Sequence, residues 1–88
     1  MGVAALSDHE AEHLARLSLQ ASADLNQVIV GWQQRGIDLG DIYLSGITEA
    51  ARTLGRWWVS DEIDFASVTV GSSRLHRLLY DFSPQFLA

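Results

Sequence analysis

Residues 38–59, DLGDIYLSGITEAARTLGRWWV, decide the fold of this chain. Apolar side chains recur through them at intervals of three and four residues, the spacing that places side chains on one face of an α-helix. The stretch predicts a helix that begins after the cap residue Asp38 and runs to about Val59. Its predicted buried face consists of Tyr43, Ile47, Ala50, Leu54 and Trp57. Residues that would let a neighbouring helix approach closely are Ile42, Gly46, Ala50 and Ala51.

Two shorter helices are expected before this stretch. Ser7 and Glu10 have the spacing of a capping box, so the first helix should begin there and end somewhere in residues 18–22. The second helix should start at the end of that range or at Asp24. It should stop at Gly36, a residue type suited to the left-handed cap. The predicted buried side chains of these two helices are Leu14, Leu17 and Ala21, then Leu25, Val28, Ile29 and Trp32.

A fourth helix is expected after a turn at residues 60–63, with Asp64 as its cap. Residues 67–70 are locally strand-like because three of the four are β-branched. The longer helical period around them outweighs this, and Pro84 is expected to end the helix. The predicted apolar face consists of Phe65, Val68, Ser72, Leu75, Leu79 and Phe82.

These elements predict one domain that covers residues 1–88. A chain of 88 residues has room for a single core. Four helices joined by short turns favour an all-α fold, an antiparallel four-helix bundle.

The composition argues against several classes of protein. The net charge is −5, whereas a nucleic-acid-binding protein needs a basic face to neutralise phosphates. The chain has no cysteine, which excludes disulfides and zinc–thiolate sites. Residues 1–6 lack the basic start and apolar run of a signal peptide. No segment has the ~20 apolar residues of a membrane span, so we expect a cytoplasmic protein.

One motif matches a catalytic pattern. His9 to His13 reads H-E-x-x-H, in which two histidines bind zinc and the glutamate acts as general base. Such a site needs a third protein ligand, and His76 is the only other histidine. A solvated helix start accounts for these residues better. The acids Asp61, Glu62 and Asp64 similarly fit a capped turn better than an acid–base pair. We therefore expect no catalytic residue, no metal site and no enzyme activity.

The adjacent tryptophans Trp57 and Trp58 are the strongest candidates for a binding role. Neighbouring positions on a helix point about 100° apart, so one face cannot bury both rings. If Trp57 follows the buried face, Trp58 points to an edge or to another surface. Trp58 then either packs over the following turn or forms one wall of a ligand site.

Several segments together resemble a known family. They are residues 41–43 and 54–58, Asp61, Phe65, Val68-Thr69-Val70-Gly71 and Arg74-Leu75-x-Arg77-Leu78-Leu79. Their order resembles the four-helix module that precedes cobalamin-binding Rossmann domains in corrinoid methyltransfer proteins, methionine synthase and CarH photoreceptors. The last two segments look most similar to the AerR/PpaA-like regulators of photosynthetic bacteria. The resemblance covers about residues 21–82.

The resemblance implies a function and a set of binding residues. In the family, the helical module covers the upper face of the corrin ring and relays a signal, without catalysis of its own. Trp58 matches a tryptophan that approaches the upper axial ligand. Val68 and Thr69 occupy the positions of a Glu-His pair found in CarH-type sensors. A Val-Thr pair implies a less polar upper face, and it lacks the histidine that could capture the cobalt.

The family's corrin-binding domain is not part of these 88 residues. The lower-ligand motif Asp-x-His-x-x-Gly belongs to that domain and is also missing. The resemblance therefore implies that residues 1–88 are either the N-terminal part of a longer cobalamin-binding protein or a protein that has lost its corrin-binding half, and we favour the first. The corrin-binding Rossmann domain would be a partner in cis or in trans. Without it, cobalamin should bind weakly or not at all.

A second hypothesis is a protein-interaction module without direct ligand binding. The charge of −5 suits docking onto a basic partner such as a transcription factor, in the manner of an antirepressor. Exposed apolar area around Trp58, Phe82 and Phe86 would then form a partner or homodimer face. A concave pocket between the third and fourth helices would favour ligand capping, and a flat apolar patch would favour the interaction module.

Overall fold

The computed structural model describes residues 6–87, with the side chains of residues 6–84. Residues 1–5 and the Phe86 side chain, for which the sequence also led to expectations, lie outside this described part of the chain. A single long helix is formed by α3, η1 and α4, which follow one another without a break. The described residues therefore form four helices and no strand. The elements are α1 (Asp8–Ser18), α2 (Leu25–Gln34), α3 (Leu39–Asp41), η1 (Ile42–Ile47), α4 (Thr48–Val59) and α5 (Phe65–Leu87).

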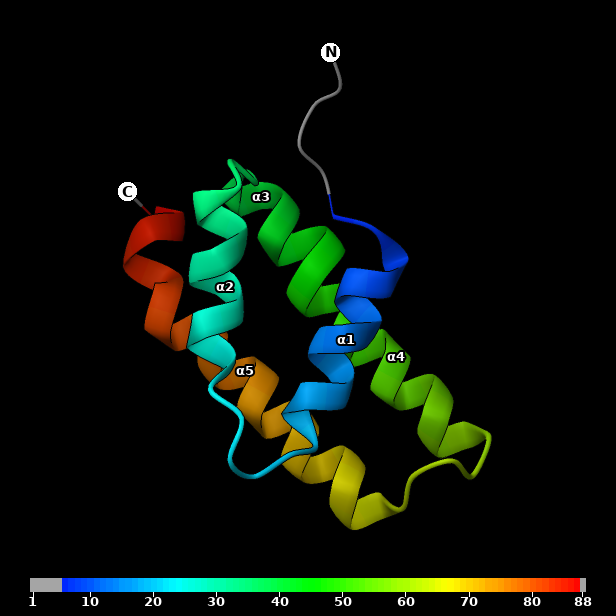
Figure 1. Cartoon of the computed structure of the whole chain (residues 1–88). Helices are drawn as coiled ribbons and strands as arrows, with labels where there is room; N and C mark the ends of the chain where they lie inside the picture. The colour runs from blue at the N-terminus through cyan, green and yellow to red at the C-terminus, as the bar shows by residue number, and fades with distance from the viewer. Residues whose placement is uncertain (1–5, 88) are drawn as a thin grey trace.

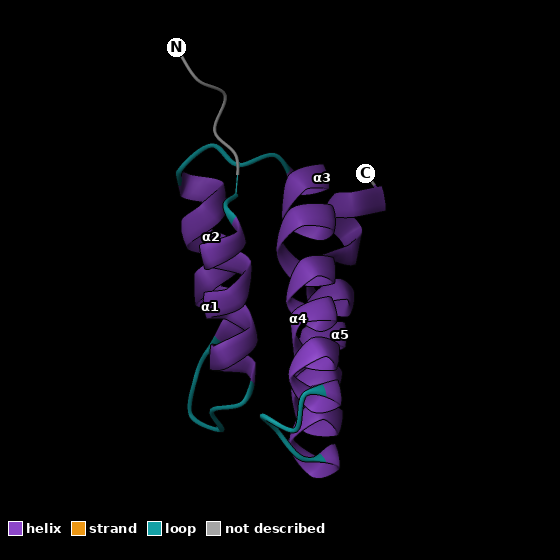
Figure 2. Cartoon of the chain, turned by 90° about the vertical axis from the view of Figure 1, so that its right-hand side faces the viewer, coloured by secondary structure: helices purple, strands orange, loops and turns teal. Residues whose placement is uncertain are grey.

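The four helices alternate in direction and form two layers. Figure 1 shows each helix running roughly opposite to the one before it. Figure 2 shows α1 and α2 in one layer and the long α3–η1–α4 helix with α5 in the other. The predicted all-α fold of four packed helices is confirmed. Within residues 6–87, no helix is both long and apolar enough to cross a membrane.

The predicted starts of the first two helices are confirmed by their caps. Glu10 donates its N–H to the Ser7 hydroxyl at 3.3 Å, and the Glu10 carboxylate accepts the Ser7 N–H at 3.3 Å. Asp24 caps α2 by accepting the Asn26 N–H at 3.1 Å. Gly36, just beyond α2, has a φ of +84°, a conformation that glycine adopts without steric cost. Local sequence therefore sets these boundaries.

The π-helical segment η1 changes the register of the long helix. A π-helical turn accommodates one more residue than an α-helical turn. Ile42 and Ile47 are therefore both buried, on the same face as Ala50 and Leu54. Tyr43 is 40% exposed, so its predicted place on the buried face is wrong. The extra residue turns the start of the helix by about 100° relative to α4.

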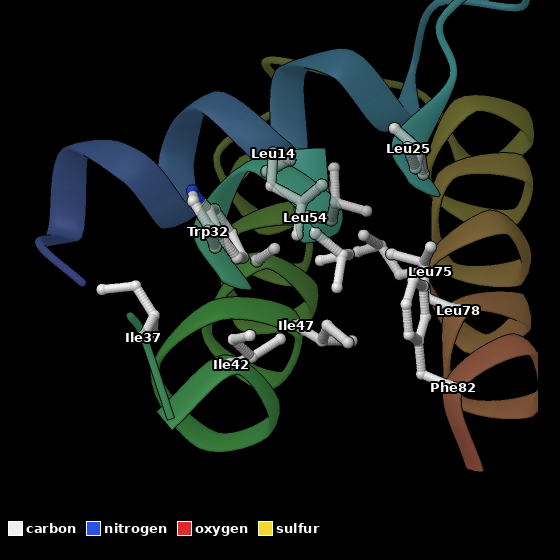
Figure 3. Close-up of a cluster of buried hydrophobic side chains, with 13 residues drawn as sticks. Leu14, Leu25, Trp32, Ile37, Ile42, Ile47, Leu54, Leu75, Leu78 and Phe82 are labelled. Carbon is white, nitrogen blue, oxygen red and sulfur yellow. The ribbon is translucent and has the colours of Figure 1, made fainter. Parts of the chain in front are cut away.

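The core lies between the two layers, and glycines allow the helices to approach closely. A Cβ at Gly46 would stand 2.6 Å from Cζ3 of Trp32, and a Cβ at Gly71 would stand 2.9 Å from Cδ1 of Leu54. The predicted close approach at Gly46 is thus confirmed, whereas Ala51 is exposed. The buried cluster (Figure 3) consists of Leu14, Ala15, Leu25, Ile29, Trp32, Ile37, Ile42, Ile47, Ala50, Leu54, Leu75, Leu78 and Phe82.

The buried face of α5 differs in part from the predicted face. It is centred on Leu75, Leu78 and Phe82. Phe82 is 6% exposed, so its expected contribution to an exposed partner face is wrong. Phe65 lies about 100° around the helix from that centre and is 67% exposed, so its predicted burial is wrong. Val68 and Leu79 lie at the margin, partly buried against the core.

Pro84 does not end α5, which continues to Leu87. A proline inside a helix leaves the carbonyl four residues earlier without its N–H donor. That carbonyl belongs to Tyr80, and it accepts a hydrogen bond from the Ser83 hydroxyl at 3.1 Å. The neighbouring serine thus supplies the donor that the proline lacks, and the helix passes through it.

Arg74 ties α5 to the end of α1 and to the connection that follows it. The carbonyl oxygens of Leu17 and Ser18 accept from its guanidinium at 3.3 and 2.9 Å. Two further carbonyls, those of Gln20 and Ala23, accept from the same group. The Leu17 and Ser18 carbonyls belong to the last turn of α1, where a helix leaves carbonyls without intrahelical partners. These hydrogen bonds fix the position of α5, which carries part of the candidate site.

Candidate functional site

The candidate site starts from Trp58, the penultimate residue of α4. Its side chain is 46% exposed. Trp57 is partly buried against the core, and the Arg16 guanidinium carbon lies 5.2 Å from its ring centroid. The prediction that Trp57 faces the core and Trp58 points to another surface is therefore confirmed. Trp58 presents an aromatic surface that the rest of the chain covers only in part.

Phe65 completes this surface. Its ring centroid lies 5.8 Å from that of Trp58, with the two planes inclined by 56°. This geometry is within the range of favourable aromatic pairs. Val59, beside Trp58, is 81% exposed. Trp58, Val59 and Phe65 are called the α4–α5 corner below. From the sequence, Phe65 was predicted to lie on the buried face of α5. Its position directly after the cap residue of α5 is the signal that could have indicated its exposure.

The turn between α4 and α5 brings the two rings together. Asp61 has a φ of 62°, which reverses the chain after α4. The Trp57 carbonyl accepts the Glu62 N–H at 2.8 Å, and the Ser60 hydroxyl donates to the Glu62 carboxylate at 2.8 Å. These contacts hold the turn, and with it the spacing between Trp58 and Phe65.

Asp64 is the cap of α5, as predicted. Its carboxylate accepts the Ser67 N–H at 2.7 Å. This backbone hydrogen bond favours the ionised form and holds the pKa of Asp64 below its ordinary value. The acids of the turn therefore have structural roles, and Asp64 fixes the first turn of α5, where Phe65 lies.

Val68 and Thr69 lie in different environments. Val68 is partly buried and packs against the core. Thr69 is exposed, and its hydroxyl donates to the Phe65 carbonyl at 2.8 Å. The oxygen of Thr69 can still accept a hydrogen bond, one helical turn beyond Phe65. Thr69 therefore lies beside the α4–α5 corner, whereas Val68 points mainly towards the interior.

The H-E-x-x-H motif has no third ligand nearby. His9 and His13 are exposed on α1. The Glu10 carboxylate is bound by Ser7 and by the Arg35 guanidinium, and the Arg35 hydrogen bond is the main cause of a lowered Glu10 pKa. Across residues 6–84, no three metal-ligating side chains gather into a group. The observed role of Glu10 is structural.

A hollow of about 400 Å³ borders the same turn but does not contain the candidate residues. Trp57, and not Trp58, forms its aromatic wall, while Trp58 stands on the outer corner. The ring pair therefore forms an exposed apolar surface and does not enclose a ligand. Of the two arrangements considered from the sequence, this is the one expected for an interaction module. The hollow is lined by Arg16, Leu19, Gln20, Trp57, Glu62 and Ile63.

Comparison of the chain with protein-family models, with curated proteins and with solved structures found no match. Residues 6–87 form a compact all-α domain of four helices.

Proposed function

We propose that this chain is a helical cap that covers the upper face of cobalamin held by a corrin-binding domain. In this proposal it relays the state of the ligand within a bacterial sensor or regulator and is not catalytic. The observation that carries the proposal is the half-exposed Trp58 ring paired with Phe65 at the α4–α5 corner. The resemblance of residues 21–82 to cap modules supplies the identity of the ligand.

Burial of this aromatic pair would favour binding. Removing apolar surface from water contributes about 25 cal/mol per Å², and aromatic rings offer a large contact area. Trp58 and Phe65 would face the ligand, and the Thr69 oxygen could accept one hydrogen bond from it. Val68 would support α5 from the core side. The lower axial ligand and most corrin contacts would come from the other domain.

Weak binding to the isolated chain can be tested by nuclear magnetic resonance with cyanocobalamin and hydroxocobalamin as probes. The chain has three tryptophans in three environments, so their indole N–H signals form an internal control. Trp32 is 5% exposed, Trp57 is partly buried and Trp58 is 46% exposed. We expect millimolar cobalamin to shift the Trp58 signal and the backbone signals around Phe65 and Thr69, and to leave Trp32 unchanged.

Two variants make the test specific. Trp58→Ala should abolish the shifts at residues 65–69, because the main contact surface is lost. Leu44→Ala removes apolar surface at a side chain that is 64% exposed on η1, away from the corner, and should leave them intact. The proposal fails if cobalamin shifts signals only outside the corner, or if the shifts at the corner persist in Trp58→Ala.

The second candidate is an interaction module that docks onto a basic transcription factor. The acids Asp61 and Glu62 favour it, because they border the exposed Val59 and Trp58 and complement a basic surface. An arginine-rich amphipathic peptide is the matching probe. If that peptide shifts Trp58 and residues 60–64 while cobalamin does not, the interaction module replaces the cap as the proposed function.

A further inference from the structure

A second exposed stripe runs along the outer side of α5. Its residues follow one another at alternating intervals of four and three, the spacing of a helix–helix seam. All are exposed, with Val70 at 55% and Tyr80 at 72%. The stripe is turned about 100° from Phe65, so it is separate from the α4–α5 corner. These residues, called the outer seam below, are Ala66, Val70, Ser73, Arg77, Tyr80 and Pro84.

The outer seam contains a hollow of about 470 Å³. Ser73, His76, Arg77 and Tyr80 line it together with Asp81. The first four have the spacing i, i+3, i+4 and i+7, which is the set of residues that receives a side chain of a facing helix in knobs-into-holes packing. The His76 and Tyr80 rings meet edge to face with centroids 5.4 Å apart, and this contact orients one wall of the hollow.

The charge of the outer seam suits contact with a second copy of this chain. Two copies with a net charge of −5 repel each other over most of their surface. Residues 65–80 contain no carboxylate, although the chain has eleven. The carboxylate that borders the hollow, Asp81, accepts a hydrogen bond from the Asn26 side chain at 3.2 Å. Arg77 is the only charged residue of the seam. Among the described residues it has no hydrogen-bonding or ionic partner, whereas the other five arginines contact carboxylates or carbonyls.

We propose that α5 pairs with α5 of a second copy, antiparallel, about a two-fold axis that passes beside Ser73. In this register Val70 of each copy enters the hollow of the other. Small and large residues then lie opposite each other: Ala66 faces Tyr80, and Val70 faces the aliphatic part of Arg77. The contact is isologous, so it closes as a dimer.

The single charge of the seam can be accommodated in this register. The methylene groups of Arg77 can cover Val70 while the guanidinium stays in water, as long basic side chains commonly do. The two Arg77 Cα atoms would lie about 11 Å apart along the helix axes. That exceeds the Debye length of about 8 Å at physiological salt, so their repulsion is weakened.

The absence of cysteine allows a direct test of the register. Ser73→Cys places a single thiol beside the proposed axis, where two copies come within disulfide distance. We expect oxidation to convert this variant into a covalent dimer. Arg52→Cys carries its thiol at an exposed position on α4 and should remain monomeric under the same conditions. A Ser73→Cys protein that stays uncrosslinked, or that crosslinks no faster than Arg52→Cys, overturns the proposal.

Sedimentation velocity across a range of concentrations tests the energetics. The unmodified chain should show a monomer–dimer equilibrium. Val70→Lys places a second cation opposite Arg77 of the other copy and should weaken association at least tenfold, whereas Arg77→Leu should strengthen it severalfold. Circular dichroism checks that both exposed substitutions leave the helices intact. Association that survives Val70→Lys but is lost in Val59→Glu would assign the contact to the α4–α5 corner and overturn this proposal. The outer seam does not use Trp58, so neither result bears on cobalamin binding.

Discussion

At the scale of single residues, two glycines of the long helix have opposite surroundings. A Cβ at Gly46 would press against the Trp32 ring, whereas a Cβ at Gly55 would meet nothing within 4 Å. We expect Gly46→Ala to destabilise the fold by about 1–3 kcal/mol, because an overpacked core has to shift. Gly55→Ala should stabilise it by about 0.5–1 kcal/mol, because alanine loses less backbone entropy in a helix. Urea unfolding followed by circular dichroism measures both changes.

The two variants control for each other, since both add one methyl group to the same helix. Opposite signs are the expected signature of close packing at Gly46. Trp32 also reports on the cause, because its ring has to move in Gly46→Ala and its indole N–H signal should shift. Two stabilities that change in the same direction, with an unchanged Trp32 signal, would contradict the close contact.

At the scale of the element, η1 determines which side of the long helix faces the core. Leu44 is 64% exposed within this π-helical turn. Its deletion should convert the turn into regular α-helix, and Ile42 and Ile47 would still share the buried face. We expect the deletion variant to fold with an unfolding free energy no lower than that of the parent chain. Thermal unfolding and the dispersion of amide signals provide the measurement.

Deletion of Ala51 is the matched control. Ala51 is also exposed, but it lies in the regular helix α4. Its removal turns Ile47 by about 100° relative to Leu54, so the two no longer face the same core. This variant should lose cooperative unfolding. If both deletions were equally damaging, the register assigned to η1 would be incorrect.

How much the sequence predicts depends on whether a feature is local. The caps at Ser7, Asp24 and Asp64 were predictable because a cap requires only residues within three positions of it. The outward direction of Trp58 follows from helix geometry once Trp57 is buried. The exposure of Tyr43 and the pairing of Phe65 with Trp58 were not predictable. The first depends on the extra residue that the π-helical segment η1 accommodates, and the second on the backbone of the turn at residues 60–64.

At the scale of the whole molecule, one ionic contact joins the start of α1 to the end of α2. Arg35, just beyond α2, donates to the carboxylate of Glu10 in α1. This hydrogen bond is the largest influence on both groups: it lowers the pKa of Glu10 and raises that of Arg35. Ser7 adds a backbone hydrogen bond to the same carboxylate. The contact therefore couples the cap of one helix to the end of the next, within the layer that covers the core.

This coupling predicts how stability responds to acid. A carboxyl group whose pKa is lowered by folding stabilises the fold above its unfolded pKa and loses that effect as the pH falls through its folded pKa. The unfolding free energy should therefore decrease below about pH 4.5, the ordinary pKa of Glu10, and Glu10→Gln should make the decrease less steep. Arg35→Gln should flatten the curve to a similar extent. The double variant should add little, because the two residues act through one contact.

Urea unfolding at low salt between about pH 7 and pH 3 measures the slopes, since salt would screen an exposed ion pair. Parallel curves for the parent chain and all three variants would mean that Glu10 and Arg35 do not contact each other in solution.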